Sequence, residues 1–147
     1  MTSAPPVHEE MRGVTLLLII VGLLSIGFPS NVSSQQQAVR ATAGTDGVQR
    51  INLVAGEYFF EPRHIIVKLN VPVEIAATKK RGMTPHNIVI EAPEAGVEVS
   101  ESLSTKPRII RFTPRKSGTY AFYCDKKLLF FKSHREKGME GVLEVRP

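Results

Sequence analysis

The chain has a single cysteine, Cys124, and no tryptophan among its 147 residues. One cysteine cannot form a disulfide within the chain, so a disulfide-stabilised scaffold is excluded. The lone thiol needs an explanation, and coordination of a metal ion provides one. A buried inert thiol or an intermolecular bridge is the alternative.

Long segments with helical periodicity are also missing after the N-terminal region, which argues against an α/β fold. Short runs rich in β-branched and aromatic residues recur instead, bounded by Gly, Pro and Asn. Residues 95–104 are expected to hold a turn or a short helix. Seven or eight strands in about 100 residues predict an all-β sandwich or small barrel. The predicted strands are residues 50–55, 64–69, 71–78, 86–91, 108–113, 119–124 and 141–145.

Uncharged apolar residues form one long run, residues 13–28, which follows Arg12 and precedes Pro29. The run is shorter than the about 20 residues that span a bilayer and fits the apolar part of a signal peptide. No small-residue cleavage motif follows it, so an uncleaved anchor helix is the alternative. We expect residues 1–28 to be this signal peptide or membrane anchor, residues 29–48 a flexible linker and residues 49–147 the folded domain. The expected location is the periplasm or the outer face of the cytoplasmic membrane.

The charge balance is basic, with 19 Lys and Arg against 14 Asp and Glu. This excess suggests acidic partners or anionic surfaces. Nucleic acid is a poor partner, because the basic residues are scattered and no nucleic-acid-binding motif is present. An enzyme is not expected, because the sequence shows no Ser-His-Asp arrangement with supporting context, no phosphate-binding glycine loop and no carboxylate pair in the candidate metal site described below.

Alternation along two predicted strands shows which side chains face the core. Period 2 places Tyr120, Phe122 and Cys124 on one face, so the thiol ends a core-facing row. His86 shares a face with the isoleucines two and four residues later. Both candidate ligands therefore begin or end a buried face.

Residues 124–139 carry the most informative pattern, because Cys124, His134 and Met139 lie between two predicted strands. A loop at one end of a sandwich can gather these three side chains, and His86 completes a set of two imidazoles, a thiolate and a thioether. That set suits copper, although Cys and His also bind zinc. Met83 is a second candidate for the axial ligand. Each residue also has an ordinary alternative, a core position for His86 and Met139 and a solvated loop position for His134.

At this point the sequence resembles a known family. The motifs GTYAFYC, a later His, GM and GVLEV, preceded by PHNIVI, are similar to those of cupredoxins, particularly the periplasmic domain of cytochrome c oxidase subunit II. The resemblance covers residues 49–147 and implies a Greek-key β-sandwich. It implies that His86, Cys124, His134 and Met139 bind one copper ion, and that Asn87 links the two ligand segments.

Two departures from the family pattern affect the site. Nine residues separate Cys124 from His134, a longer spacing than in simple blue copper proteins. No second cysteine is present, which excludes the binuclear copper-A centre of subunit II.

The function expected from these residues is one-electron transfer by mononuclear copper, Cu(I)/Cu(II). The expected partner is a redox protein such as an acidic cytochrome or a respiratory oxidase, and the N-terminal segment provides membrane contact if it is retained. A module for copper delivery, storage or resistance is an alternative, as is a structural subunit of a respiratory complex.

The apolar run Leu128, Leu129, Phe130 and Phe131 lies between the candidate ligands Cys124 and His134. We expect it to fold inward as a short turn that caps the core. If it is exposed instead, it provides a docking patch beside the site.

Overall fold

The computed structural model describes Met1 and residues 37–147. The predicted signal or anchor segment, residues 1–28, therefore lies outside the described residues except for Met1, as do residues 29–36 of the predicted linker. Within the described part of the chain, no helix is long and apolar enough to cross a membrane.

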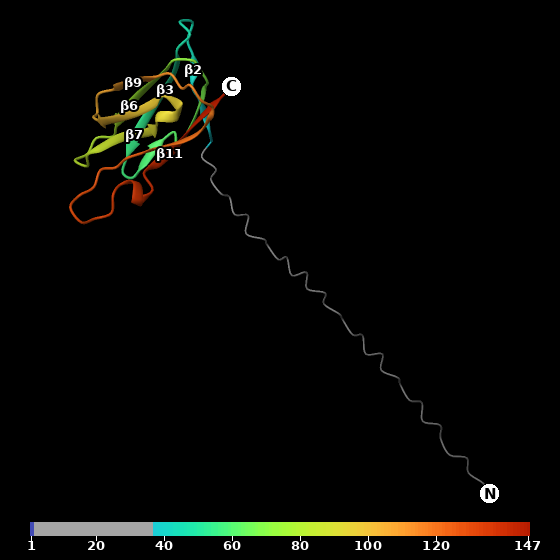
Figure 1. Cartoon of the computed structure of the whole chain (residues 1–147). Helices are drawn as coiled ribbons and strands as arrows, with labels where there is room; N and C mark the ends of the chain where they lie inside the picture. Colours follow the sequence, from blue (N-terminus) through green and yellow to red (C-terminus); the bar gives the residue numbers. More distant parts are fainter. Residues whose placement is uncertain (2–36) are drawn as a thin grey trace. The chain divides into compact units, whose positions relative to one another are not determined.

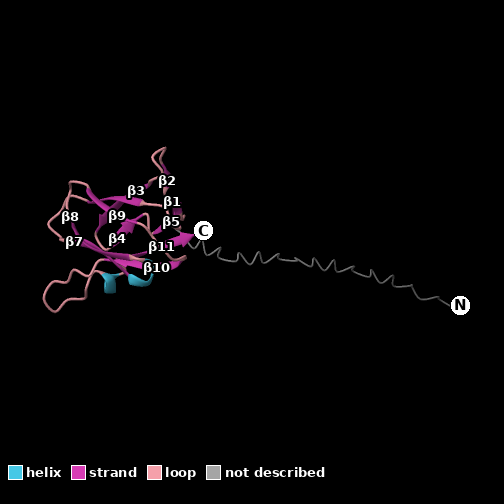
Figure 2. Ribbon diagram, turned by 45° about the horizontal axis from the view of Figure 1, so that its top comes forward, coloured by secondary structure: helices cyan, strands magenta, loops and turns pink. Residues whose placement is uncertain are grey.

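Two β-sheets enclose a single core (Figure 2). The first sheet has six strands in the order β1-β5-β11-β10-β7-β8. β5 pairs in parallel with both β1 and β11, and the other neighbours are antiparallel. The bounds are β1 Val39–Arg40, β5 His64–Lys68, β7 His86–Ala92, β8 Val97–Leu103, β10 Gly118–Tyr123 and β11 Glu140–Arg146.

The second sheet follows the order β2-β3-β6-β9 (Figure 1). β4 pairs with β3 outside this order. β3 and β6 are parallel, and the remaining pairs are antiparallel. The predicted all-β sandwich is confirmed, and each of the seven predicted strands is present. The bounds are β2 Thr42–Ala43, β3 Gln49–Gly56, β4 Phe59–Glu61, β6 Val73–Lys79 and β9 Arg108–Phe112, and the two short 3-10 helices are η1 Pro93–Ala95 and η2 Arg135–Lys137.

The core forms where the inward faces of the two sheets meet. Alternation is clear in β3, where Ile51, Leu53 and Ala55 are buried between more exposed neighbours. Phe60 of β4 packs edge-on against Phe122 of β10, with ring centroids 5.3 Å apart. This aromatic contact joins the two sheets beneath the candidate site.

Two sequence predictions need correction. Residues 95–104 were expected to form a turn or short helix, but most of them form β8, in which Val97, Val99 and Leu103 point inward. The predicted linker ended at residue 48, yet β1 pairs with β5 and β2 pairs with β3. These short strands satisfy backbone hydrogen bonds at otherwise open strand edges, so the ordered domain begins before residue 49.

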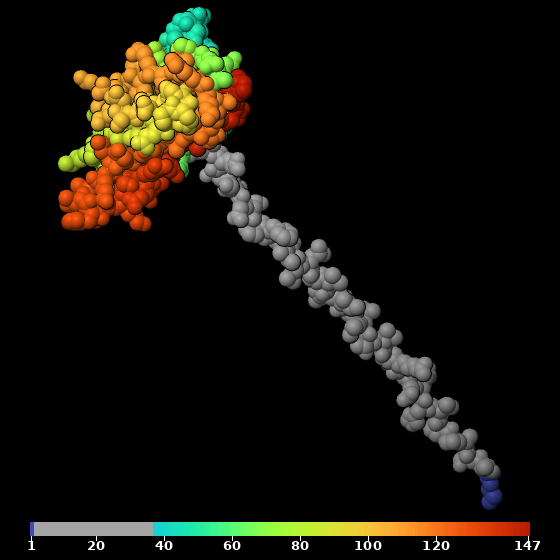
Figure 3. All heavy atoms as spheres, viewed as in Figure 1, coloured from blue at the N-terminus to red at the C-terminus, as the bar shows by residue number. Residues whose placement is uncertain are grey.

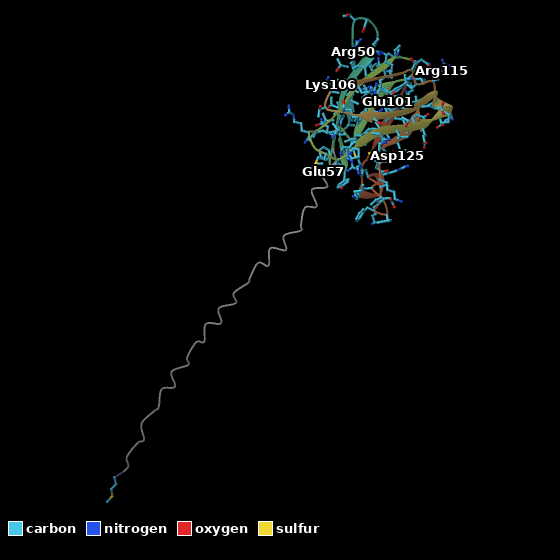
Figure 4. The ribbon with its side chains drawn as sticks, turned by 90° about the vertical axis from the view of Figure 1, so that its left-hand side faces the viewer. Arg50, Glu57, Glu101, Lys106, Arg115 and Asp125 are labelled. Carbon is cyan, nitrogen blue, oxygen red and sulfur yellow. The ribbon has the colours of Figure 1, made fainter. Side chains whose placement is uncertain are left out.

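The candidate ligands gather at one end of the sandwich. Figure 4 shows Arg50, near the start of β3, at one end, and Glu57 and Asp125 toward the other. Glu57 directly follows β3, and Asp125 directly follows Cys124. The loop between β10 and β11, residues 124–139, lies at this second end and is called the site loop below.

Candidate metal centre

His86 is the first residue of β7, a strand with neighbours on both sides. It lies opposite Leu103 of β8 and is buried. The next four residues of β7 are also buried, because the strand lies inside its sheet. The backbone that carries the imidazole is therefore held firmly in place.

Cys124 directly follows β10 and is fully buried, in agreement with the alternation Tyr120, Phe122, Cys124. Its backbone N–H donates to the Met139 carbonyl at 3.1 Å, which closes the site loop at its base. The antiparallel pairing of β10 with β11 thus places Cys124 beside Met139, although fourteen residues lie between them.

His134 lies in the site loop just before η2. Its backbone N–H donates to the Lys126 carbonyl at 2.8 Å, and its carbonyl accepts from the Met139 N–H at 2.9 Å. Gly138 ends η2 with a φ of 91°, a left-handed conformation that favours glycine. This tight turn brings the His134 side chain back over the end of the sandwich, where it is buried.

The three side chains converge on one point. The Nδ1 atoms of His86 and His134 are 3.1 Å apart, and the Cys124 Sγ lies 3.4 Å from His134 Nδ1 and 4.0 Å from His86 Nδ1. Ligands bonded to one ion at about 2.0–2.3 Å in a trigonal plane are roughly 3.5–3.8 Å apart. The cluster therefore fits a single small metal ion, and its two imidazoles and one thiol form a donor set suited to copper.

Burial sets the protonation of these groups. It lowers the pKa of His86 to about 4, with further contributions from the nearby charges of His134 and Lys79. Burial also lowers the pKa of His134, and it raises the pKa of the Cys124 thiol. At neutral pH both imidazoles are uncharged and offer lone pairs, while the thiol must lose its proton when a metal binds.

Asn87 connects β7 to the site loop. Its backbone N–H faces the Cys124 Sγ at 3.5 Å, its side-chain Nδ2 donates to Asp125 Oδ1 at 2.8 Å, and its Oδ1 accepts from the Asp125 N–H at 3.1 Å. These contacts join β7 to the start of the site loop. The hydrogen bond to sulfur lowers the thiol pKa and so opposes the effect of burial.

The two methionines proposed as axial ligands differ sharply in their surroundings. Met139 is fully buried at the base of the site loop, next to the Cys124 backbone. Met83 is fully exposed, outside the buried cluster. His64 lies on β5, where it pairs with Glu144 at 2.8 Å and takes no part in the cluster.

Sequence reasoning missed Tyr58, which contacts His134. The two rings meet edge-on with centroids 5.1 Å apart, and Lys137 Nζ donates to the Tyr58 hydroxyl at 3.0 Å. Tyr58 lies in the turn between β3 and β4 with a φ of 60°, which is uncommon for a residue with a side chain. No periodic pattern marks this position, so only the fold reveals that it covers the site.

A hollow beside His134 leads to solvent. Its apolar walls come from Tyr58, Met83, Leu128 and Phe131, and several lysines line it as well. The run 128–131 was expected to cap the core but is exposed along its whole length. The expectation was wrong because the aliphatic and aromatic residues of the sheets already fill the core.

The structure is a β-sandwich with a buried His-Cys-His cluster whose geometry is suited to a metal ion. The cupredoxin-like domain family matches residues 16–141, and the chain belongs to this family. Among curated proteins, no sequence matches the chain.

Solved structures share the fold at low sequence identity. The metal-binding domain of the Cu(I)-exporting P-type ATPase CopA of Streptococcus pneumoniae, solved with Cu(I), is 24% identical, with a TM-score of 0.58 over 76% of this chain and 98% of that one. A copper-binding protein in its apo form is 21% identical, with a TM-score of 0.57 over 76% and 99%. A heme-copper terminal oxidase is 19% identical, with a TM-score of 0.54 over 85% and 83%. These likenesses support the fold.

Proposed function

We propose that this cupredoxin-like protein holds one copper ion through His86, Cys124 and His134 and passes single electrons. The observation that carries the proposal is the convergence of two imidazole nitrogens and one sulfur, all within 4.8 Å of one another, in a buried cluster. Met139 is proposed as the weak axial ligand, because it is buried at the base of the same loop.

A bound copper ion would supply a Cu(I)/Cu(II) couple. The protein contributes a fixed set of donors, because His86 is carried by an internal strand and Cys124 is tied to Met139 and Asn87. Such a site favours electron transfer, since ligands that do not move keep the cost of rearrangement small. Asn87 acts as a supporting residue that positions the cysteine.

The basic surroundings of the site indicate the partner. Lys79, Lys80 and Arg81 line one hollow that reaches His86, and Lys126, Lys127 and Lys137 line the hollow at His134. We propose a redox protein with an acidic surface, such as a cytochrome or a respiratory oxidase, as electron partner. We also propose that the protein works outside the cytoplasm, in the periplasm or at the outer face of the membrane. The apolar run at residues 13–28 supports that location.

Titration of the full chain with Cu(II) tests the proposal, with visible absorption and electron paramagnetic resonance as readouts. We expect an intense thiolate-to-copper band that saturates at one copper per chain and is bleached reversibly by a mild reductant. The band should be absent in Cys124→Ser and altered in His134→Gln. His64→Gln is the matched control, because His64 is outside the cluster, and it should leave the spectrum unchanged.

Copper delivery or storage is a second candidate, favoured by the exposed thioether of Met83. Met83 lines the same hollow as His134, where it could meet incoming Cu(I). Tight Cu(I) binding without the thiolate-to-copper band, weakened by Met83→Leu, would support this candidate over electron transfer. Absence of any copper binding would refute both and leave a structural role in a larger complex.

A further inference from the structure

The site loop ends in a convex apolar tip. Leu128, Leu129, Phe130 and Phe131, called the apolar tip below, are 67%, 70%, 90% and 59% exposed. Figure 3 shows the orange-red segment that contains them projecting from the rest of the domain. Four adjacent large apolar side chains in water are unfavourable for an isolated domain, so the tip calls for a partner surface.

The backbone of the loop holds this tip outward. The Lys126 carbonyl accepts from the His134 N–H at the base, and the Leu128 carbonyl accepts from the Phe131 N–H at 3.0 Å across the turn. Leu129, within that turn, has a φ of 48°, a conformation that leucine rarely adopts. The two phenylalanine rings lie near each other, with centroids 6.4 Å apart.

Lysines surround the tip in the sequence and are called the basic collar below. Lys126 and Lys127 precede it and Lys132 follows it. None of the salt bridges in the described part of the chain includes these three lysines. Lys127 and Lys132 do interact electrostatically with Glu136, but the site loop as a whole holds five Lys or Arg against two Asp or Glu, so an excess of positive charge remains for an external anionic surface.

We propose that the apolar tip inserts into the interfacial region of a bilayer that contains anionic lipids, with the basic collar against the headgroups. Interfacial binding of this kind combines buried apolar area with attraction to anionic lipids. A bilayer accepts a convex tip of any shape. A protein partner would need a cavity that matches a side chain as exposed as Phe130, so the membrane is the better fit.

This contact is separate from the apolar run at residues 13–28 and does not depend on bound metal. The contact would orient the domain on the membrane, because the tip belongs to the same loop as Cys124 and His134. Insertion would hold the metal-site end of the domain toward the bilayer.

The lack of tryptophan allows a direct test with the full chain. Phe130→Trp places a single fluorophore in the tip, and Thr45→Trp places one in the exposed turn between β2 and β3, at the other end of β3 from the site. Each variant is mixed with vesicles of phosphatidylcholine alone or of equal parts phosphatidylcholine and phosphatidylglycerol, with and without brominated acyl chains as depth-dependent quenchers.

We expect the emission of the Phe130→Trp variant to shift to shorter wavelength, and to be quenched by brominated lipid, only in vesicles that contain phosphatidylglycerol. The indole of the Thr45→Trp variant should remain in water even if residues 13–28 anchor the chain. Replacing the collar in the Phe130→Trp protein by Lys126→Gln, Lys127→Gln and Lys132→Gln should weaken insertion by on the order of tenfold or more, as should high salt.

Two results would overturn the proposal. A water-like emission spectrum of the Phe130→Trp variant on vesicles that retain the protein would show that the tip does not insert and would leave it as a contact for a protein. Equal insertion into neutral and anionic vesicles would show that the collar has no electrostatic role. Adding Cys124→Ser to the Phe130→Trp protein should leave insertion unchanged, which separates this test from that of copper binding.

Discussion

Asn87 and Asp125 hold each other through two hydrogen bonds, one from the Asn87 side-chain amide to the Asp125 carboxylate and one from the Asp125 N–H to the Asn87 amide oxygen. The first residue belongs to β7 and the second to the site loop, so the pair joins the segments that carry His86 and Cys124. We expect Asn87→Ala to lower the free energy of unfolding by about 1–3 kcal/mol, because it removes both bonds and leaves polar groups without partners. Urea unfolding measures this loss. Asn52→Ala, at an exposed position on β3, is the matched control and should have little effect.

Gly138 and Gly47 offer a matched pair of substitutions. Both have positive φ, 91° and 77°, and an added Cβ would meet nothing within 4 Å at either position. Alanine at each should therefore cost a similar amount of stability, roughly 1–2 kcal/mol, through backbone strain alone. Only Gly138→Ala should also weaken metal binding, because Gly138 shapes the turn that connects His134 to Met139. Equal metal affinity in the two variants, measured by competition with a chelator, would contradict this role for the turn.

Gly141 of β11 lies directly opposite Phe122 of β10. A Cβ at this position would come within 2.3 Å of the Phe122 ring and 2.6 Å of the Arg63 carbonyl oxygen. We expect Gly141→Ala to destabilise the protein by about 1–3 kcal/mol, because a buried ring or backbone must move. In thermal unfolding, the double variant with Phe122→Leu should lose less stability than the two single changes together. Strict additivity would show that the ring is not the obstacle.

The pKa of His86 gives the metal-free protein a defined pH dependence. Because burial holds that pKa at about 4 in the folded state and it is about 6.5 in an unfolded chain, the unfolded state binds more protons between these values. The free energy of unfolding should therefore fall as the pH drops from about 6.5 to about 4, with a contribution of the same sign from His134. In denaturant unfolding at several pH values, the free energy of unfolding of His86→Gln should fall less steeply with decreasing pH than that of the unchanged protein. An identical slope in both proteins would contradict the assignment.

The strands and the inward-facing side chains along them could be predicted because they depend on local patterns. Alternation in residues 119–124 placed Phe122 and Cys124 on one face, and the structure buries both. β8 was missed because its inward residues Val97 and Val99 alternate with only Glu98 and Ser100, and this short alternation is weak beside the adjacent Pro93 and Gly96.

Other features depend on contacts between distant residues. β1 and β2 have only two residues each and exist because the edges of β5 and β3 are available to pair with them. Tyr58 contacts His134 because the turn after β3 and the site loop lie at the same end of the sandwich. The two residues are 76 positions apart in the sequence. The exposure of residues 128–131 likewise follows from a core already filled by other strands.

The position of β11 inside its sheet, between β5 and β10, constrains the order in which the protein can mature. Until β11 is in place, β5 and β10 lack the strand that joins them, and the six-stranded sheet stays divided. His134 and Met139 directly precede β11 in the chain, so they reach their positions together with this strand. The cluster of His86, Cys124 and His134 can therefore be completed only when β11 takes its place between β5 and β10, so closure of the sheet and assembly of the site are coupled.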